Sequence, residues 1–146
     1  MCVPVSPPTG ARHLLRVLIV DDSEYCRLTL RAMLEAWGIE CIAASDGEEG
    51  FDKALKYEPD LVITDLQMPI CDGFGLIKKL TAIDDRRAPP VIVLSSNLSH
   101  FEGDKIELLK RARFSLLKPV DMACLLDCIQ QAVPDLPAPG EIRPRA

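Results

Sequence analysis

Residues able to take part in metal or phosphate chemistry follow four short apolar runs of the chain. These residues, with the proline after the lysine, are Asp21, Asp22, Asp65, Ser95, Lys118 and Pro119. Carboxylates that lie close together repel one another and raise each other's pKa values. A bound divalent cation relieves that repulsion, and ligand sets made only of oxygen favour Mg²⁺ or Mn²⁺. The alternative is that the three aspartates are helix caps and loop residues without a ligand.

The apolar pattern alternates between two kinds of segment. Short apolar segments that indicate strands occupy residues 17–20, 41–44, 61–64, 91–94 and 114–117, and the continuous run at 17–20 is typical of a strand buried on both faces. Amphipathic segments follow them, and we expect helices at about residues 24–37, 47–57, 74–82, 102–111 and 120–133. Five strands alternating with five helices predict an α/β fold with a parallel sheet.

Right-handed crossovers narrow this pattern to a flavodoxin-like (βα)5 three-layer sandwich with a five-stranded sheet of order 2-1-3-4-5. In that order the strands that end before Asp21 and Asp65 are neighbours. The carboxyl ends of parallel strands share one edge of the sheet, where ligands bind in such folds. We therefore expect the aspartates, Ser95 and Lys118 to meet at one functional site.

Composition and charge exclude several classes of protein. The net charge of −5 is a poor match to a nucleic-acid-binding surface, so we expect no direct nucleic-acid partner. No apolar run reaches the roughly 18 residues that would predict a membrane span. The six cysteines form no CxxC pair and lie far from both histidines, which argues against structural zinc.

Two further cysteine and terminal features bear on the cellular setting. Cys124 and Cys128 lie one helical turn apart, and we expect a buried thiol pair there rather than a redox pair. The first residues lack the charged-then-apolar form of a secretory signal. Together these features predict a reducing, cytoplasmic setting.

Five stretches of the chain resemble the response-regulator receiver domains of two-component signalling. They are residues 17–23, residues 59–69, Asp72-Gly73, residues 91–96 and residues 117–119. The resemblance covers residues 17–133, and the motifs occur in the order and spacing of a single domain. It implies a phosphorylation-activated switch that passes its state to a partner protein.

The resemblance also implies roles for individual residues. Asp65 would be the phospho-acceptor, and Mg²⁺ (or Mn²⁺) would be bound by Asp22, Asp65 and the Gln67 backbone carbonyl, with Asp21 acting mostly through water. Lys118 and Ser95 would stabilise the phosphoryl oxygens. The peptide bond before Pro119 would be cis, as some X–Pro bonds are. The implied partners are a histidine kinase or histidine phosphotransfer protein and a downstream protein effector, with a possible phosphorylation-dependent dimer.

The chain departs from the family at the switch region, which comprises Ser96, Phe114 and Ser115. Receiver domains usually carry Tyr or Phe three residues before the lysine, and here Ser115 stands there. Phe114 falls on the opposite face of the predicted strand. We therefore expect the loop and helix at about residues 96–111, rather than a rotating ring, to transmit activation.

Proline-rich stretches at both ends of the chain indicate the limits of the folded domain. We expect a proline-rich tail over residues 1–15, the receiver domain over 16–133, and a second proline-rich tail or linker over 134–146. The chain would catalyse only its own phosphorylation and dephosphorylation. A pseudo-receiver scaffold without phosphate stays open, whereas an aspartyl phosphatase lacks a second carboxylate at Gln67. A flavin carrier is disfavoured because Asp21 and Asp22 would repel its phosphate.

Overall fold

The computed structural model describes residues 15–83, 88–98 and 101–133. Within them the strands are β1 (Arg16–Val20), β2 (Glu40–Ala44), β3 (Leu61–Thr64), β4 (Val91–Ser95) and β5 (Phe114–Leu117). The helices are α1 (Glu24–Glu35), α2 (Gly47–Tyr57), α3 (Gly73–Thr81), α4 (Asp104–Lys110) and α5 (Met122–Ala132). The expected tails fall almost wholly outside the described residues.

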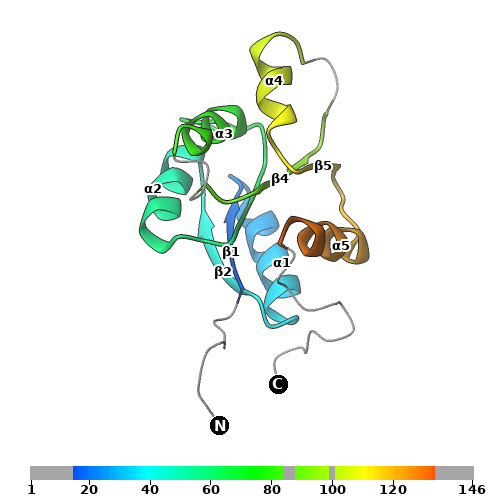
Figure 1. Cartoon of the computed structure of the whole chain (residues 1–146). Coiled ribbons are helices and arrows are strands. Elements are labelled where there is room, and N and C mark those ends of the chain that lie inside the picture. The colour runs from blue at the N-terminus through cyan, green and yellow to red at the C-terminus, as the bar shows by residue number, and fades with distance from the viewer. Residues whose placement is uncertain (1–14, 84–87, 99–100, 134–146) are drawn as a thin grey trace.

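All five strands belong to one parallel sheet of order β2-β1-β3-β4-β5. The predicted fold class and strand order are therefore confirmed. Helices α1 and α5 lie on one side of the sheet and α2 and α3 on the other, which makes the three layers visible in Figure 1. Helix α4 stands beyond α3, near the β4–β5 side of the sheet (Figure 1).

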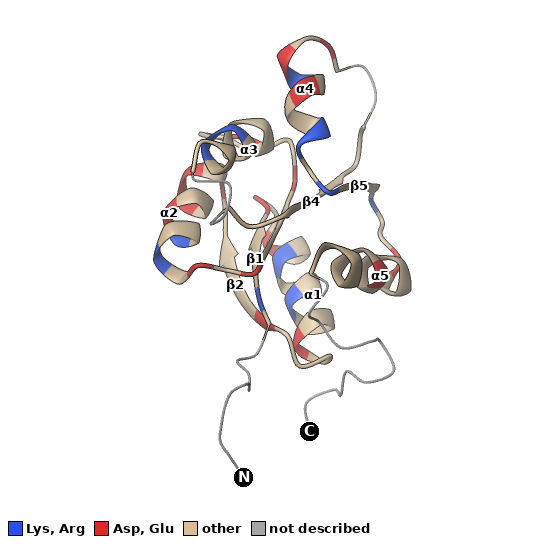
Figure 2. Ribbon diagram, viewed as in Figure 1, with Lys and Arg blue, Asp and Glu red and all other residues tan. Residues whose placement is uncertain are grey.

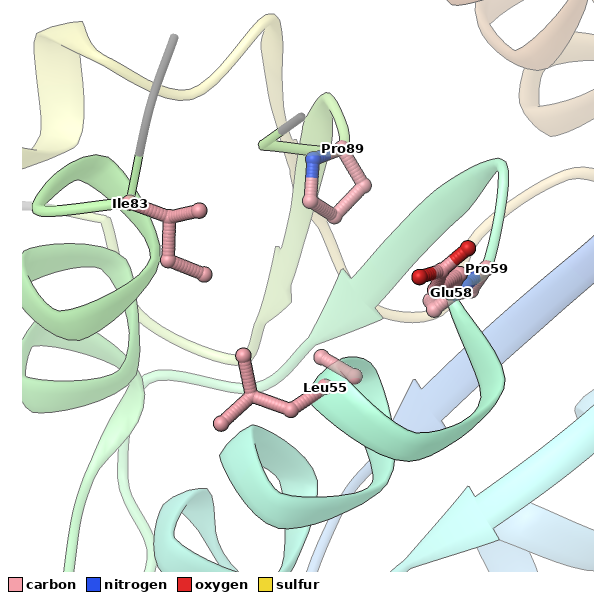
Figure 3. Close-up of a pocket in the computed structure, with 6 residues that line it drawn as sticks. Leu55, Glu58, Pro59, Ile83 and Pro89 are labelled. Atoms are coloured by element: carbon pink, nitrogen blue, oxygen red, sulfur yellow. The ribbon is translucent and has the colours of Figure 1, made fainter. Parts of the chain in front are cut away.

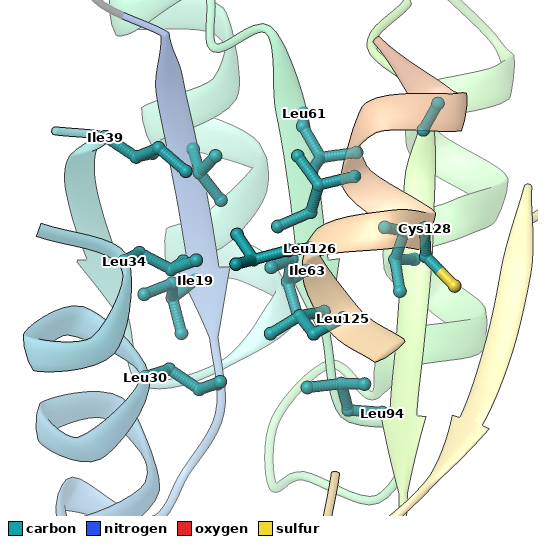
Figure 4. Packing of buried hydrophobic residues seen from close by; sticks show 14 of the residues in the cluster. Ile19, Leu30, Leu34, Ile39, Leu61, Ile63, Leu94, Leu125, Leu126 and Cys128 are labelled. Carbon is teal, nitrogen blue, oxygen red and sulfur yellow. The ribbon is translucent and has the colours of Figure 1, made fainter. Parts of the chain in front are cut away.

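The three central strands, β1, β3 and β4, divide their apolar side chains between two cores, which explains why their sequences read as almost continuous apolar runs. In β1, Val17 and Ile19 face the core beneath α1 and α5, part of which is drawn in Figure 4. Leu18 and Val20 face the core beneath α2 and α3. Burial on both faces fixes the register of the strand, because a shift by one residue would exchange the two sets.

Polar caps begin the helices that follow β1, β2 and β3. Ser23 accepts a hydrogen bond from the Cys26 amide at the start of α1. Asp46 and Asp72 accept hydrogen bonds from amides in the first turns of α2 and α3. Each cap satisfies a helix N–H that would otherwise lack a partner. These caps fix the loops at the carboxyl edge of the sheet, where the candidate site lies.

The thiol prediction for α5 is only half right. Cys128 is buried in the first core, as expected, but Cys124 is exposed. Positions i and i+4 are neighbours on a helix surface, yet the apolar stripe of α5 is narrow enough that only one of them faces the core. Among the residues described, no helix is long and apolar enough to cross a bilayer.

Candidate functional site

Two neighbouring strands carry the three aspartates to one edge of the sheet. The Asp21 amide donates to the Ala44 carbonyl at 3.1 Å, and the Asp65 amide donates to the Val20 carbonyl at 2.9 Å. These bonds extend the strand ladder beyond β1 and β3 and hold both backbones in place. As a result, one carboxylate oxygen from each of Asp21, Asp22 and Asp65 lies within 4.8 Å of the others.

Lys118 reaches this cluster from the far end of β5. Its Nζ lies 2.7 Å from Asp21 Oδ2 and 3.2 Å from Asp65 Oδ2. The peptide bond between Lys118 and Pro119 is cis. Burial alone would lower the pKa of Lys118, but the hydrogen bonds and charges of Asp21 and Asp65 outweigh it, so the pKa lies above its ordinary value. Lys118 is therefore a fixed positive charge between two carboxylates.

The Asp65 carboxylate is oriented by hydrogen bonds at both oxygens. Oδ1 accepts from the Leu66 amide at 2.6 Å and from the Gln67 amide at 3.4 Å, while Oδ2 faces Lys118. The side chain is 13% exposed, against 3% for Asp21. Asp65 is thus held in one orientation but remains more accessible to an incoming group than Asp21, while Asp22 is exposed.

Ser95 lies at the same edge of the sheet, at the end of β4. Its carbonyl accepts from the Lys118 amide at 2.9 Å, which ties the ends of β4 and β5 together. Its hydroxyl is buried and donates to the Asn97 carbonyl at 3.1 Å. Ser96 and Gln67 are exposed at the rim.

The two faces of β5 differ at the switch region. Phe114 is half-buried and packs against the core beneath α1 and α5. Ser115 and Leu117 lie on the other face and are exposed, Leu117 by 58%. The Phe114 ring and Ser115, which stands three residues before Lys118, therefore lie on opposite sides of the sheet.

Two residues that support the site, Cys26 and Arg27, carry no functional signal in the sequence. The Arg27 guanidinium donates to the Asp21 carbonyl at 2.8 Å, which fixes the turn between β1 and α1. Cys26 Sγ lies 3.7 Å from Lys118 Nζ. Both side chains belong to the first turn of α1. The helical periodicity of the sequence predicts that turn, but no charge pattern or motif distinguishes these two residues from surface residues. The Cys26 contact depends on how α1 packs against the β5–α5 loop, and the Arg27 contact depends on how α1 lies against the end of β1.

The arrangement can bind a cation and neutralise transferred negative charge. Its acidic ligand atoms are all oxygens, the set that Mg²⁺ and Mn²⁺ prefer. Exposed Asp22 and partly exposed Asp65 leave that cluster open on its solvent side. Lys118 supplies a positive charge that already pairs with Asp21 and Asp65 and could also pair with a bound anion. The three aspartates therefore form a cluster that could hold a metal ion.

Two proteins with known names are similar in sequence to this chain. Protein PilH of Pseudomonas aeruginosa is 38% identical over 117 residues, which cover 80% of this chain and 95% of PilH. A protein-glutamate methylesterase/protein-glutamine glutaminase of Anaeromyxobacter dehalogenans is 48% identical over 89 residues. That match covers 60% of this chain, which spans only 25% of the length of the enzyme.

A solved structure and a family model cover nearly the whole folded part. The structure of the chemotaxis response regulator CheY4 of Vibrio cholerae has a TM-score of 0.71 and 30% identity, covering 82% of this chain and 99% of that one. Residues 17–130 match the family model named "Response regulator receiver domain". The chain therefore belongs to the response-regulator receiver domains of two-component signalling.

Proposed function

We propose that this chain is a phosphorylation-activated signalling switch in which Asp65 accepts a phosphoryl group from a histidine kinase or histidine phosphotransfer protein. The observation that carries the proposal is the close cluster of Asp21, Asp22 and Asp65, two of which, Asp21 and Asp65, contact the Lys118 ammonium. Phosphoryl transfer needs little protein chemistry beyond positioning and neutralisation of charge on the transferring oxygens. The cluster offers both.

In the proposed step an Asp65 oxygen forms a bond to phosphorus while the bond from phosphorus to the donor histidine nitrogen breaks. The electron pair of that bond returns to the imidazole, and the product is an acyl phosphate on Asp65. The amides of Leu66 and Gln67 hold the carboxylate for the attack. Lys118 then pairs with a phosphoryl oxygen, and the Ser95 hydroxyl exchanges its Asn97 partner for another.

The proposed cofactor is Mg²⁺, with Mn²⁺ as a substitute. Asp22, Asp65 and the Gln67 carbonyl would hold the ion directly, and Asp21 mostly through water. When bound, the ion supplies positive charge to the phosphoryl oxygens. Asp21 is less available as a direct ligand because its side chain is only 3% exposed, against 13% for Asp65, and the Ser23 amide and Lys118 already bond to its two oxygens.

The proposed partners are proteins. An apolar groove of about 380 Å³ lies between α1 and the β5–α5 loop and reaches Lys118, with Tyr25 on its rim exposed by 78%. A donor protein that docked there would bring its histidine to Asp65. Along α2 and α4 acidic and basic residues are interspersed (Figure 2), which supports a protein rather than a nucleic acid as effector.

Acetyl phosphate with Mg²⁺ tests this proposal. We expect intact-protein mass spectrometry to show one added phosphoryl group, which disappears in Asp65→Asn and in the presence of a chelator. Asp52→Asn, a change on the exposed surface of α2, is the matched control and should label like the wild type. Equal labelling of Asp65→Asn would refute Asp65 as the acceptor. Absence of labelling in the wild type would favour the pseudo-receiver alternative.

A further inference from the structure

Strand β5 forms one edge of the sheet, and none of the other described strands pairs with its outer side. The Arg113 amide, just before the strand, donates to the Val91 carbonyl of β4 at 2.7 Å. Successive residues of a strand direct their backbone groups to opposite sides, so Phe114 and Leu116 turn their N–H and C=O groups away from β4. An edge that presents such groups is a template for pairing with another chain.

The other edge of the sheet, formed by β2, is protected. The Lys53 ammonium on α2 donates to the Ala43 carbonyl at 2.6 Å and also pairs with Glu49. A charged side chain laid over an edge in this way hinders the approach of another strand. Within the part of the chain that the structure describes, no side chain makes such a bond to the β5 backbone. Of the two edges, β5 is therefore the one open to a partner.

Basic side chains surround the open edge, although the whole chain carries a net charge of −5. Residues 110–118 contain no carboxylate, and their cationic members are Lys110, Arg111, Arg113 and Lys118. Figure 2 shows such blue residues at the end of α4 and in the connection to β5. Arg113 is exposed, and among the described residues no carboxylate pairs with it. The charge at this edge therefore favours an acidic partner.

The exposed face of β5 offers a second contact. Arg113, Ser115 and Leu117 alternate along the chain, so they lie on the same face of the sheet. Leu117 is 58% exposed and lines a pocket of about 310 Å³ together with residues 96–98. Helix α4 leaves this face uncovered, because none of its residues is buried and it lies beside α3 (Figure 1). A pocket of this size suits one apolar side chain.

These two contacts define the chemistry of the partner. A strand added to β5 places alternate side chains over the same face, so its residues over Leu117 and over Arg113 are four positions apart. The first would be apolar and the second acidic. A row of backbone N–H and C=O groups pairs with a peptide backbone, which selects an extended peptide.

A second copy of the chain and a second groove fit these observations less well. Antiparallel pairing of two β5 strands would bring the cations of both copies together, and like charges on opposed strands are destabilising. A groove of about 300 Å³ between the ends of α2 and α3 is drawn in Figure 3. It lies beside β3 and β4, which are both paired on two sides, and Glu58 in its wall would repel an acidic peptide.

We propose that the β5 edge binds an acidic peptide in extended conformation, which joins the sheet as a further strand. The peptide backbone pairs with Phe114 and Leu116. An apolar side chain of the peptide enters the pocket beside Leu117, and a carboxylate four positions away pairs with Arg113. The site shares no residue with the aspartate cluster, so its test is separate from that of phosphorylation at Asp65.

Two fluorescein-labelled peptides, EETDTVTLEE and EELTVTDTEE, test the proposal for the two possible strand directions. We expect fluorescence anisotropy to show that at least one of them binds the full chain without Mg²⁺ or a phosphoryl donor. Arg113→Glu and Leu117→Asp should each weaken that binding by about ten-fold or more. The matched control is Lys56→Glu, the same change of charge on the exposed surface of α2, and it should alter binding by less than about two-fold.

Two further measurements test the backbone pairing itself. Replacing the central VT pair of each peptide with PP removes amides that the ladder needs and should abolish binding. Binding of the unaltered peptide should slow hydrogen exchange at the Phe114 and Leu116 amides. It should leave the methyl resonances of Leu55, which lines the groove in Figure 3, unchanged.

Several outcomes would overturn the proposal. No binding by either peptide would do so, and so would binding that Arg113→Glu leaves unchanged. Binding that shifts the Leu55 resonances without slowing exchange in β5 would place the peptide in the groove between α2 and α3. Slowed exchange at Phe114 and Leu116 that depends on protein concentration alone would assign the edge to a second copy of the chain. Tighter binding of a single-stranded DNA of ten nucleotides at the same edge would assign it to nucleic acid.

Discussion

Lys118→Met tests whether the Lys118 ammonium is the charge that holds the carboxylate cluster together. Methionine keeps most of the aliphatic stem and removes only the charge and its hydrogen bonds. Asp21 and Asp65 then face each other with their oxygens less than 4.8 Å apart and no cation between them. The variant should be less stable than the wild type when no divalent cation is present.

The expected magnitude follows from the geometry. At an effective dielectric constant of about 20, the attractions at 2.7 and 3.2 Å amount to about 6 and about 5 kcal/mol before desolvation is subtracted. Removing one partner of a buried ion pair typically costs about 3–5 kcal/mol. Because the Lys118 side chain is 22% exposed, we expect the lower end of that range, about 3 kcal/mol.

Urea unfolding in metal-free buffer measures this loss as a lower midpoint with an unchanged m-value. Lys110→Met is the matched control, because it breaks only the exposed pair with Glu107 and should change stability little. Adding Mg²⁺ should restore stability to Lys118→Met more than it stabilises the wild type, since the cation replaces the missing charge. A loss in Lys118→Met no larger than in Lys110→Met would refute Lys118 as the buried counter-ion.

Three other predictions concern pH, backbone strain and activation. Hydrogen bonds from Ser45, assisted by Lys53, lower the pKa of Glu49 to about 2 in the folded protein, so the stabilisation that its carboxylate supplies is present above pH 4.5 and is lost as the pH falls toward 2. The stability advantage of the wild type over Glu49→Gln should therefore vanish near pH 2. A stability difference that stays constant with pH would contradict this prediction. Ile70 has φ 67° and is 80% exposed, so Ile70→Asn should stabilise the protein by about 1 kcal/mol in urea unfolding, and a loss of stability would contradict the strain. Beryllofluoride with Mg²⁺ should change amide exchange mainly in residues 95–111, whereas changes confined to Phe114 would favour an aromatic switch.

The sheet was predictable from the sequence because its three central strands, β1, β3 and β4, are buried on both faces. In β1 the four residues after Arg16 are all apolar and buried, so the carboxyl end of the strand follows from where the apolar run meets Asp21. Helix α4 was harder to delimit. It has only seven residues, no buried side chain, and Gly103 without a capping side chain before it, so its start is weakly encoded. The expected helix over residues 102–111 is accordingly longer than the observed one.

The candidate site was predictable in its membership but not in its contacts. Strand order alone places Asp21 beside Asp65, because β1 and β3 are neighbours. Strand order also places Lys118 at this edge of the sheet, but its ion pair with Asp21, 97 residues away in the sequence, was not predicted and is seen only in the structure. The support from Arg27 depends on how α1 tilts against β1, and sequence periodicity does not specify a tilt.

Chemical mapping of the phosphorylated residue is the most direct test of whether Asp65 accepts the phosphoryl group. Borohydride reduces an acyl phosphate to an alcohol, so an aspartyl phosphate becomes homoserine and is identified in the peptide that contains it. After treatment with acetyl phosphate and Mg²⁺, we expect homoserine at position 65 alone, and none when Mg²⁺ is chelated. Homoserine at position 21 or 22, or phosphate retained on the protein with residue 65 unchanged, would contradict it.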